Sequence, residues 1–294
     1  MRLAQELYEG VNLKGKGSIG LITYLRTDST RISEEADANC REYIGQQYGE
    51  EFVGDKKSVK TTKTGKIQDA HEAIRPTDSS LSPAMIKEQL PRDLFRLYQL
   101  IWTRFVASRM AEAVYETTSV KIEAGEYHFN VAASRVKFDG FMTVYSYDTE
   151  KSTMNAAMKK ITKDTEITLS ELKPQQHFTQ PPAHFTEASL VKTLEELGIG
   201  RPSTYAPTIT TLLARRYIVK ENKNLYITEL GEAVNDMMED GFPTIVDVNF
   251  TANMESLLDS VEEGKVKWKT VVENFYPDMI QAVEKAEKEL EEVK

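Results

Sequence analysis

The spacing of hydrophobic residues changes several times along the chain. Near the N-terminus, apolar residues recur at helical spacing, which predicts a short helix over residues 2–9 and a longer one from about Ser33 to Tyr48. Ser33 is a favourable N-cap, because its hydroxyl can accept a hydrogen bond from the first turn and acidic residues follow it. A strongly amphipathic stretch predicts a third helix over residues 91–113, whose apolar stripe we expect in a core.

Between about residues 115 and 175 the hydrophobic period falls to two, which predicts a β region. Gly125-Glu126 and Asp139-Gly140 are candidate hairpin turns, because glycine accepts the positive φ that tight hairpins need. Residues 167–169 continue the strand pattern. We therefore expect a sheet between two helical regions.

Helical spacing returns after a linker over residues 174–182. A helix is predicted from Thr186 to Leu197, a second helix ends at Arg215 after a glycine turn, and a small hairpin follows over residues 217–227. Helix, turn, helix and hairpin in this order are typical of a winged helix-turn-helix. The remainder is helical and acidic, so we expect a multidomain α+β fold that is mainly α.

Composition limits the class of protein. The chain has 294 residues, 40% of them hydrophobic, which is enough for more than one packed domain. Cys40 is the single cysteine, so neither an internal disulfide nor a cysteine zinc site can form. No stretch approaches about 18 continuous apolar residues, and no signal-peptide pattern opens the chain. We expect a soluble, cytoplasmic protein that does not contact a membrane.

The net charge of −9 does not decide for or against nucleic-acid binding. Residues 221–294 contain 18 Asp and Glu against 7 Lys and Arg, a net of −11, which leaves residues 1–220 at +2. The acid is therefore concentrated in the C-terminal helical part, and the rest of the chain is mildly basic.

One short segment combines a strand end with candidate chemistry. Residues 21–24 predict a strand, residues 27–30 predict a turn, and alternation places Tyr24 and Arg26 on the same face. A phenol is a weak nucleophile, with an ordinary pKa of about 10, but a guanidinium favours the phenolate and can hold a phosphate by two parallel bonds. The pair suits attack on a phosphodiester. A packed strand residue beside a solvated arginine explains the same pattern.

Further polar residues suit phosphate binding. His71 and Arg75 are four apart, so a helical turn would place both on one side, although a surface helix-capping role also explains His71. Five lysines in residues 51–66 form either a solvated loop or a phosphate-steering loop. The start of the second predicted helix in the C-terminal half offers backbone N–H groups beside polar side chains, which together suit a phosphate-binding site. The residues concerned are Arg201, Ser203 and Thr204, and the same helix ends in Arg215-Arg216.

Three segments resemble a known family in the same order. The first is Ile22-Thr23-Tyr24-Leu25-Arg26-Thr27-Asp28-Ser29-Thr30, and the second is Ala70-His71-Glu72-Ala73-Ile74-Arg75-Pro76-Thr77. The third runs from Pro181-Pro182-Ala183-His184-Phe185-Thr186-Glu187-Ala188-Ser189-Leu190 to Gly198-Ile199-Gly200-Arg201-Pro202-Ser203-Thr204-Tyr205-Ala206. Together they span most of the chain, which resembles the type IA DNA topoisomerases, the bacterial enzymes in particular.

The resemblance implies a reaction. In this family one DNA strand is cut, a tyrosine holds the 5′ phosphate, and another strand passes before religation, which relaxes negatively supercoiled DNA without ATP. By resemblance Tyr24 is the nucleophile, and Arg26 positions and stabilises it with the phosphate. The resemblance also implies contacts with single-stranded DNA at His71, Arg75, Arg201, Ser203, Thr204, Tyr205 and Arg215.

The resemblance implies an architecture as well. We expect a winged-helix-like catalytic-tyrosine domain over residues 1–113, half of a β arch over 114–178, and a helical DNA-binding domain with a helix-turn-helix and wing over 179–294. The family also needs a toprim domain whose Asp-x-Asp-x-Glu cluster binds Mg²⁺. Asp-x-Asp does not occur in this sequence. We therefore expect a monomeric fragment that holds no metal, binds single-stranded DNA, and does not cleave it without the toprim domain.

Two other classes of protein share some of these features. A tyrosine recombinase also forms a phosphotyrosine, but it needs several arginines and a His-x-x-Arg pattern, whereas His71 and Arg75 are one residue too far apart. A non-enzymatic winged-helix DNA-binding module explains residues 180–230 and leaves residues 23–30 unexplained. Cleavage chemistry discriminates them, because type IA enzymes block the 5′ end of a cut strand and recombinases the 3′ end.

Overall fold

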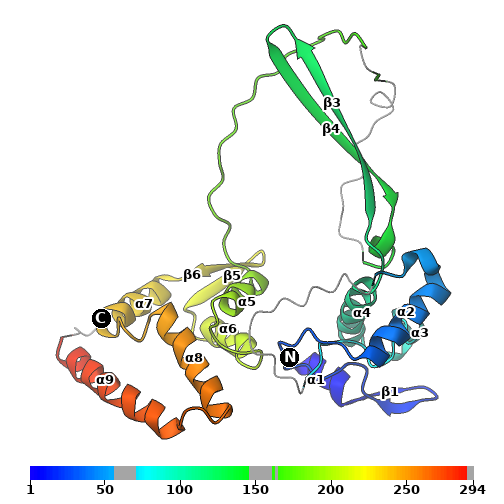
Figure 1. Cartoon of the computed structure of the whole chain (residues 1–294). Helices are drawn as coiled ribbons and strands as arrows, with labels where there is room; N and C mark the ends of the chain where they lie inside the picture. The colour runs from blue at the N-terminus through cyan, green and yellow to red at the C-terminus, as the bar shows by residue number, and fades with distance from the viewer. Residues whose placement is uncertain (56–70, 146–160, 163–164, 290–294) are drawn as a thin grey trace. The chain divides into compact units, whose positions relative to one another are not determined.

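The computed structural model describes residues 1–55, 71–145, 161–162 and 165–289 (Figure 1). The lysine-rich stretch from Lys56 to Lys66 and Ala70 lie outside these residues. Helices account for 48% of the chain and strands for 16%, so the expected mixed, mainly helical class is confirmed at that level. The chain forms two compact units, Met1–Gln175 and Gln176–Lys294. The finer division at residues 113 and 178 stays a prediction.

The first unit begins with helices that the hydrophobic pattern predicted. Ser33 accepts a hydrogen bond from the Ala36 N–H at 3.3 Å, which confirms it as an N-cap. The third predicted helix ends at Ala107, six residues before the expected end. The elements are α1 (Arg2–Glu9), β1 (Val11–Leu13), β2 (Gly17–Ile19), α2 (Glu34–Tyr48), α3 (Pro83–Ile86) and α4 (Arg92–Ala107).

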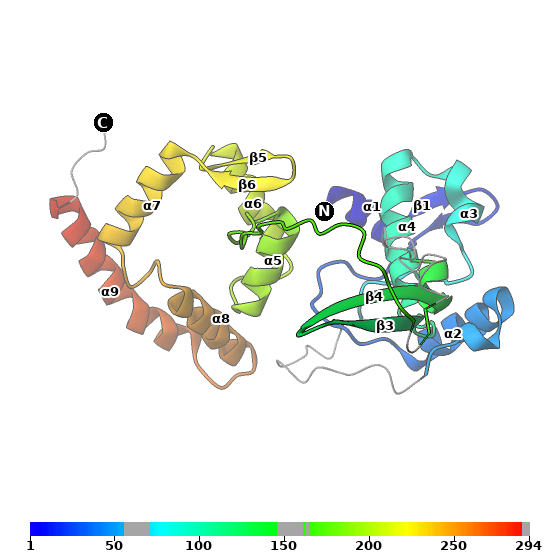
Figure 2. The same ribbon diagram turned by 90° about the horizontal axis from the view of Figure 1, so that it is seen from above.

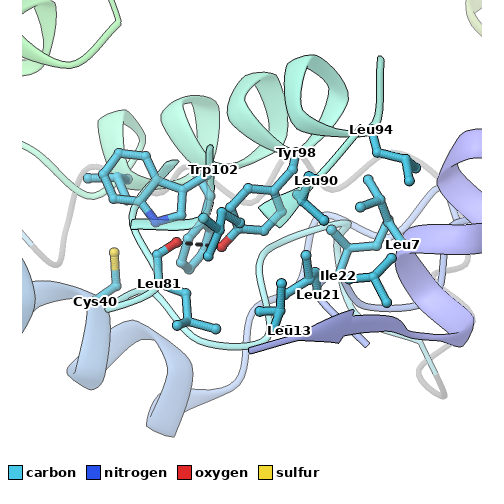
Figure 3. Packing of buried hydrophobic residues seen from close by; sticks show 14 of the residues in the cluster. Leu7, Leu13, Leu21, Ile22, Cys40, Leu81, Leu90, Leu94, Tyr98 and Trp102 are labelled. Carbon is cyan, nitrogen blue, oxygen red and sulfur yellow. Dashed lines mark hydrogen bonds between the residues drawn. The ribbon is translucent and has the colours of Figure 1, made fainter. Parts of the chain in front are cut away.

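The core of this unit lies where α4 packs against α1, α2 and the segment that carries Leu21 and Ile22 (Figure 3). The two large polar aromatics in it satisfy their polar atoms. The Tyr98 hydroxyl donates to the Leu81 carbonyl at 2.7 Å, and the Trp102 indole N–H donates to the Ser79 carbonyl at 2.9 Å. These bonds tie the loop before α3 to α4, and both aromatic residues belong to the same core cluster as Leu21 and Ile22.

A long antiparallel ribbon forms the β part of the first unit (Figure 1). It pairs β3 (Val114–Ala124) with β4 (Tyr127–Phe138), and the turn is at Gly125-Glu126 as predicted, with Gly125 at a φ of +63°. The second predicted hairpin, at Asp139-Gly140, is wrong. A short 3₁₀ turn occupies Gly140–Thr143 instead, because Gly140 packs so close to the Ala111 and Glu112 carbonyls that only glycine fits.

The strand expected over residues 167–169 is also wrong, because this segment is extended without strand pairing to any other described residue. Among the described residues the strands form three separate two-stranded sheets, the pairs β1–β2, β3–β4 and β5–β6.

The second unit is helical with one small hairpin (Figure 2). Thr186 and Ser189 form a capping box at the start of α5, so the predicted start of this helix is confirmed. The hairpin turns at Asn222 and Lys223, both with positive φ as two-residue turns require. The elements are α5 (Glu187–Glu196), α6 (Tyr205–Ala214), β5 (Ile218–Glu221), β6 (Asn224–Ile227), α7 (Glu229–Gly241), α8 (Val248–Glu262) and α9 (Trp268–Glu289).

Candidate active site

The segment with Tyr24 is not the strand that its residues predicted. Ile22 forms one isolated bridge with Pro76, and no described strand includes residues 21–24. Its backbone is held by separate bonds: the Leu21 N–H donates to the Leu7 carbonyl at 2.7 Å, and the Thr23 N–H donates to the Arg75 carbonyl at 2.9 Å. The Leu21 carbonyl also accepts from the Thr77 N–H at 3.0 Å, so residues 21–23 pair with residues 75–77 over a stretch that is too short to form a strand.

The side chain of Thr23 joins this segment to residues 73–75. Its hydroxyl donates to the Ala73 carbonyl at 2.7 Å and accepts from the Arg75 N–H at 2.9 Å. The Ala73 N–H in turn donates to the Arg31 carbonyl at 2.8 Å. These contacts keep residues 71–77 extended, so the helical turn expected at His71–Arg75 is wrong. A helix would need the same backbone groups for itself.

Tyr24 lies between two other aromatic rings. Its ring stacks on His71, with a centroid distance of 5.1 Å and an interplanar angle of 22°, and the ring of Tyr8 meets it edge-on at 5.5 Å and 73°. Tyr24 is half-buried, which restrains the ring and leaves part of it accessible. The structure therefore brings together Tyr24 and His71, which the sequence had singled out in two separate segments.

Tyr8 was not among the residues that the sequence suggested. It belongs to α1, where its spacing from other residues indicates only that it lies on one face of a helix. Its contact with Tyr24 follows from the bond between the Leu21 N–H and the Leu7 carbonyl and from Gly20, where an added Cβ would lie 2.5 Å from the Tyr8 carbonyl oxygen. A glycine directly before the tyrosine segment was the one signal of such a close approach.

Arg26 is exposed and borders a cavity of about 340 Å³ together with the side of α1. Within the described part of the chain its guanidinium forms no ion pair. An exposed guanidinium of this kind can bind a phosphate oxygen. The remaining lining of the cavity is Met1, Arg2, Gln5, Glu6, Glu9 and Gly10.

Arg75 is already engaged by its neighbours. Its guanidinium pairs with Glu72 at 2.7 Å and donates to the Pro76 carbonyl at 3.0 Å. Its backbone, rather than its side chain, makes the contacts with Thr23. In this structure Arg75 therefore fixes the segment that carries His71.

The other predicted residues lie in the second unit, at the two ends of α6, with Arg215 at its C-terminal end. The Thr204 hydroxyl accepts from the Arg201 N–H at 2.9 Å and donates to the Arg201 carbonyl at 3.0 Å, which closes the turn before Tyr205. Ser203, Thr204 and Arg215 are exposed, and Tyr205 is half-buried. The N–H groups of Thr204 and Tyr205 already donate to the Arg201 carbonyl and Pro207 has none, so the features of this helix start that suit an anion are the exposed side chains of Ser203 and Thr204.

The guanidinium of Arg201 is occupied. It donates to both carboxylate oxygens of Asp259, at 2.8 and 2.9 Å, and lies 3.4 Å from a carboxylate oxygen of Glu255. Burial alone would lower the pKa of Arg201, but the hydrogen bond to Asp259 and the charges of Glu255 and Asp259 raise it above its ordinary value. Both acids belong to α8.

No group of three or more His, Cys, Asp or Glu side chains in the described residues is arranged to hold a metal ion. No helix in that part of the chain is both long and apolar enough to cross a membrane.

Comparison with known proteins identifies the family. A model of the DNA topoisomerase family matches residues 1–273. The chain belongs to the type IA DNA topoisomerase family. A solved structure of full-length topoisomerase I from Thermotoga maritima is similar over 96% of this chain, with 39% sequence identity and a TM-score of 0.77. The matched part is 45% of that protein, so the chain spans less than half the length of this topoisomerase.

Proposed function

We propose that this chain is the part of a type IA DNA topoisomerase that carries the nucleophilic tyrosine, and that the complete enzyme relaxes negatively supercoiled DNA. The Tyr24 phenol loses its proton as its oxygen attacks a backbone phosphorus, the bond from phosphorus to the 3′ oxygen breaks, and the 3′ oxygen takes up a proton in turn. The 5′ phosphate stays on Tyr24 while another strand passes. Attack by the 3′ hydroxyl then restores the strand and releases the phenol.

The observation that carries this proposal is the placement of Tyr24 between the rings of Tyr8 and His71, with the exposed side chain of Arg26 two residues later in the chain. Two ring contacts restrict the tyrosine side chain, which reduces the entropy lost on reaching an attack geometry. Arg26 stabilises the phenolate and the extra negative charge on the phosphate during attack. His71 holds the ring through its stacking contact and, in this proposal, contacts the DNA near the attacked phosphate.

The second unit supplies DNA binding in this proposal. Its order of α5, α6 and the β5–β6 hairpin supports a winged helix-turn-helix, in which the start of α6 binds phosphate through Ser203, Thr204 and Tyr205. Arg215, exposed at the other end of α6, binds a further phosphate of the same single strand. The proposed divisions are a tyrosine domain over 1–113, a partial β arch over 114–178 and a DNA-binding domain over 179–294.

Type IA topoisomerases are generally Mg²⁺-dependent. The described residues offer no cluster that suits the ion, so we assign its ligands to a toprim domain outside this chain. No step above runs through a metal held by these residues. The isolated chain, a monomer in this proposal, then binds single-stranded DNA without cleaving it.

The test is cleavage of an end-labelled single-stranded oligonucleotide by the complete enzyme and by the isolated chain, each with Mg²⁺. We expect a covalent adduct at the 5′ end from the complete enzyme only. An adduct at the 3′ end would indicate recombinase chemistry. Binding by both proteins without an adduct from either would favour a non-enzymatic DNA-binding module, and an adduct from the isolated chain would overturn the proposed need for a toprim domain.

A further inference from the structure

Arg201 is held in a clamp made by one face of α8. Its two terminal nitrogens donate to Asp259, to the Gly200 carbonyl at 2.8 Å and to the Glu255 carbonyl at 3.4 Å, and Glu255 adds a carboxylate at 3.4 Å. Asp259 and Glu255 are four residues apart on α8, so successive turns present both acids to the same guanidinium. One terminal nitrogen of Arg201, Nη2, meets both oxygens of the Asp259 carboxylate, and a phosphate, which also presents two oxygens, can compete for the same nitrogen.

The charge of this clamp is opposite to what a phosphate site needs. One guanidinium and two carboxylates sum to +1 − 2 = −1. The clamp is nevertheless open to water, with 35% of the Arg201 side chain and 46% of the Asp259 side chain exposed. Ion pairs exposed to this degree are weak, so an incoming phosphate can exchange with the carboxylate at small cost.

We propose that Asp259, supported by Glu255, is a positioning residue that masks Arg201 and keeps it from binding DNA until the clamp opens. The carboxylate of Asp259 occupies the place that a DNA phosphate takes when Arg201 binds it. Ser203, Thr204 and Arg215, which are outside the clamp, make the first contacts with the strand. This inference rests on the proposed function of the second unit as a DNA-binding module.

Masking of Arg201 predicts how the affinity for DNA depends on salt concentration. A cation whose counter-ion is a protein carboxylate releases no bound salt ions when it meets a phosphate, so it adds nothing to the slope of log affinity against log salt concentration. Once Asp259 is neutral, Arg201 contributes a full contact, which for single-stranded DNA changes the slope by about 0.7. Asn is nearly isosteric with Asp, so Asp259→Asn removes the charge and leaves the packing of α8 in place.

The experiment is a double-mutant cycle in the 294-residue chain, with a fluorescent single-stranded oligonucleotide titrated at several salt concentrations. The four proteins are the parent, Asp259→Asn, Arg201→Ala and the double variant. We expect Asp259→Asn to tighten binding about two- to fivefold and to steepen the salt slope by about 0.7. In the parent, Arg201→Ala should change the slope little, and in the Asp259→Asn background it should cancel the whole gain.

A matched control separates masking from the general effect of removing an acid. Glu273→Gln removes the same charge from an exposed site on α9, so it should not create a gain that depends on Arg201. Far-UV circular dichroism and thermal unfolding check that each variant is folded. The inference is overturned if the gain from Asp259→Asn survives Arg201→Ala, or if Asp259→Asn and Arg201→Ala weaken binding equally. Binding by none of the proteins would overturn the proposed DNA-binding function as well.

Discussion

Replacing Thr23 by Val tests how the tyrosine segment is held. Val has nearly the same shape but no hydroxyl, so the Ala73 carbonyl loses its donor at 2.7 Å and the Arg75 N–H loses its acceptor at 2.9 Å. Each partner is part-buried, and a backbone group left unsatisfied in that setting costs about 1–2 kcal/mol. We therefore expect Thr23→Val to lower the free energy of unfolding of the first unit by about 2–4 kcal/mol.

Urea unfolding of variants that also carry Trp268→Phe, followed by the fluorescence of Trp102 in the buried core, measures this change. Thr23→Ser is the matched control, because it keeps both hydrogen bonds and loses only a methyl group, at a cost of about 1 kcal/mol. Faster hydrogen exchange at the Arg75 amide in Thr23→Val would locate the effect. Equal stability of the Val and Ser variants would refute the role of the hydroxyl.

Three further predictions concern the first unit. Burial would raise the pKa of Asp37, but hydrogen bonds from Arg41 and Arg109 outweigh burial and lower that pKa. The Asp37 carboxylate therefore stabilises the fold at every pH above its ordinary pKa. This stabilisation is lost as the pH falls through the lowered pKa. Asp37→Asn should therefore flatten acid unfolding below about pH 4, and an unchanged acid transition would contradict this. Burial raises the pKa of the Cys40 thiol to about 11, so iodoacetamide should label native protein only through unfolding; rapid labelling at pH 8 would contradict its burial. In the complete enzyme, Tyr8→Phe should preserve cleavage and Tyr8→Ala should slow it without loss of DNA binding, whereas equal rates would show that the Tyr8 ring does not position Tyr24.

The sequence predicted most of the helices because their signals are local. A cap at Ser33, a capping threonine at Thr186 and the helical period of residues 91–107 each depend on residues a few positions apart. The turn at Gly125-Glu126 was predicted for the same reason, since two strands of period two meet at a glycine. Local rules are sufficient where local bonds decide the structure.

The site needed contacts that no local pattern contains. Residues 21–24 have strand-forming side chains, but their backbone partners come from Leu7 and Arg75, so tertiary bonds replaced the expected strand. The same bonds turned the helical pattern at residues 71–75 into an extended segment. Tyr8 could not be assigned, because its contact with Tyr24 crosses 16 residues of sequence.

The residues of the second unit show a related limit. Sequence resemblance assigned a DNA contact to Arg201. It could not show that the guanidinium is already bound by Glu255 and Asp259, which lie 54 and 58 residues later in the chain. Spacing predicts which residues can reach a ligand and leaves open which are already bound within the protein.

The central claim is that Tyr24 forms the covalent bond to DNA. The most direct test is to trap the cleaved complex of the complete enzyme with an oligonucleotide, digest the protein, and map the nucleotide-bearing peptide by mass spectrometry. The account predicts a 5′ phosphate on Tyr24 and no adduct from Tyr24→Phe, with DNA binding retained. A nucleotide on any other residue, or an adduct that persists in Tyr24→Phe, would contradict it.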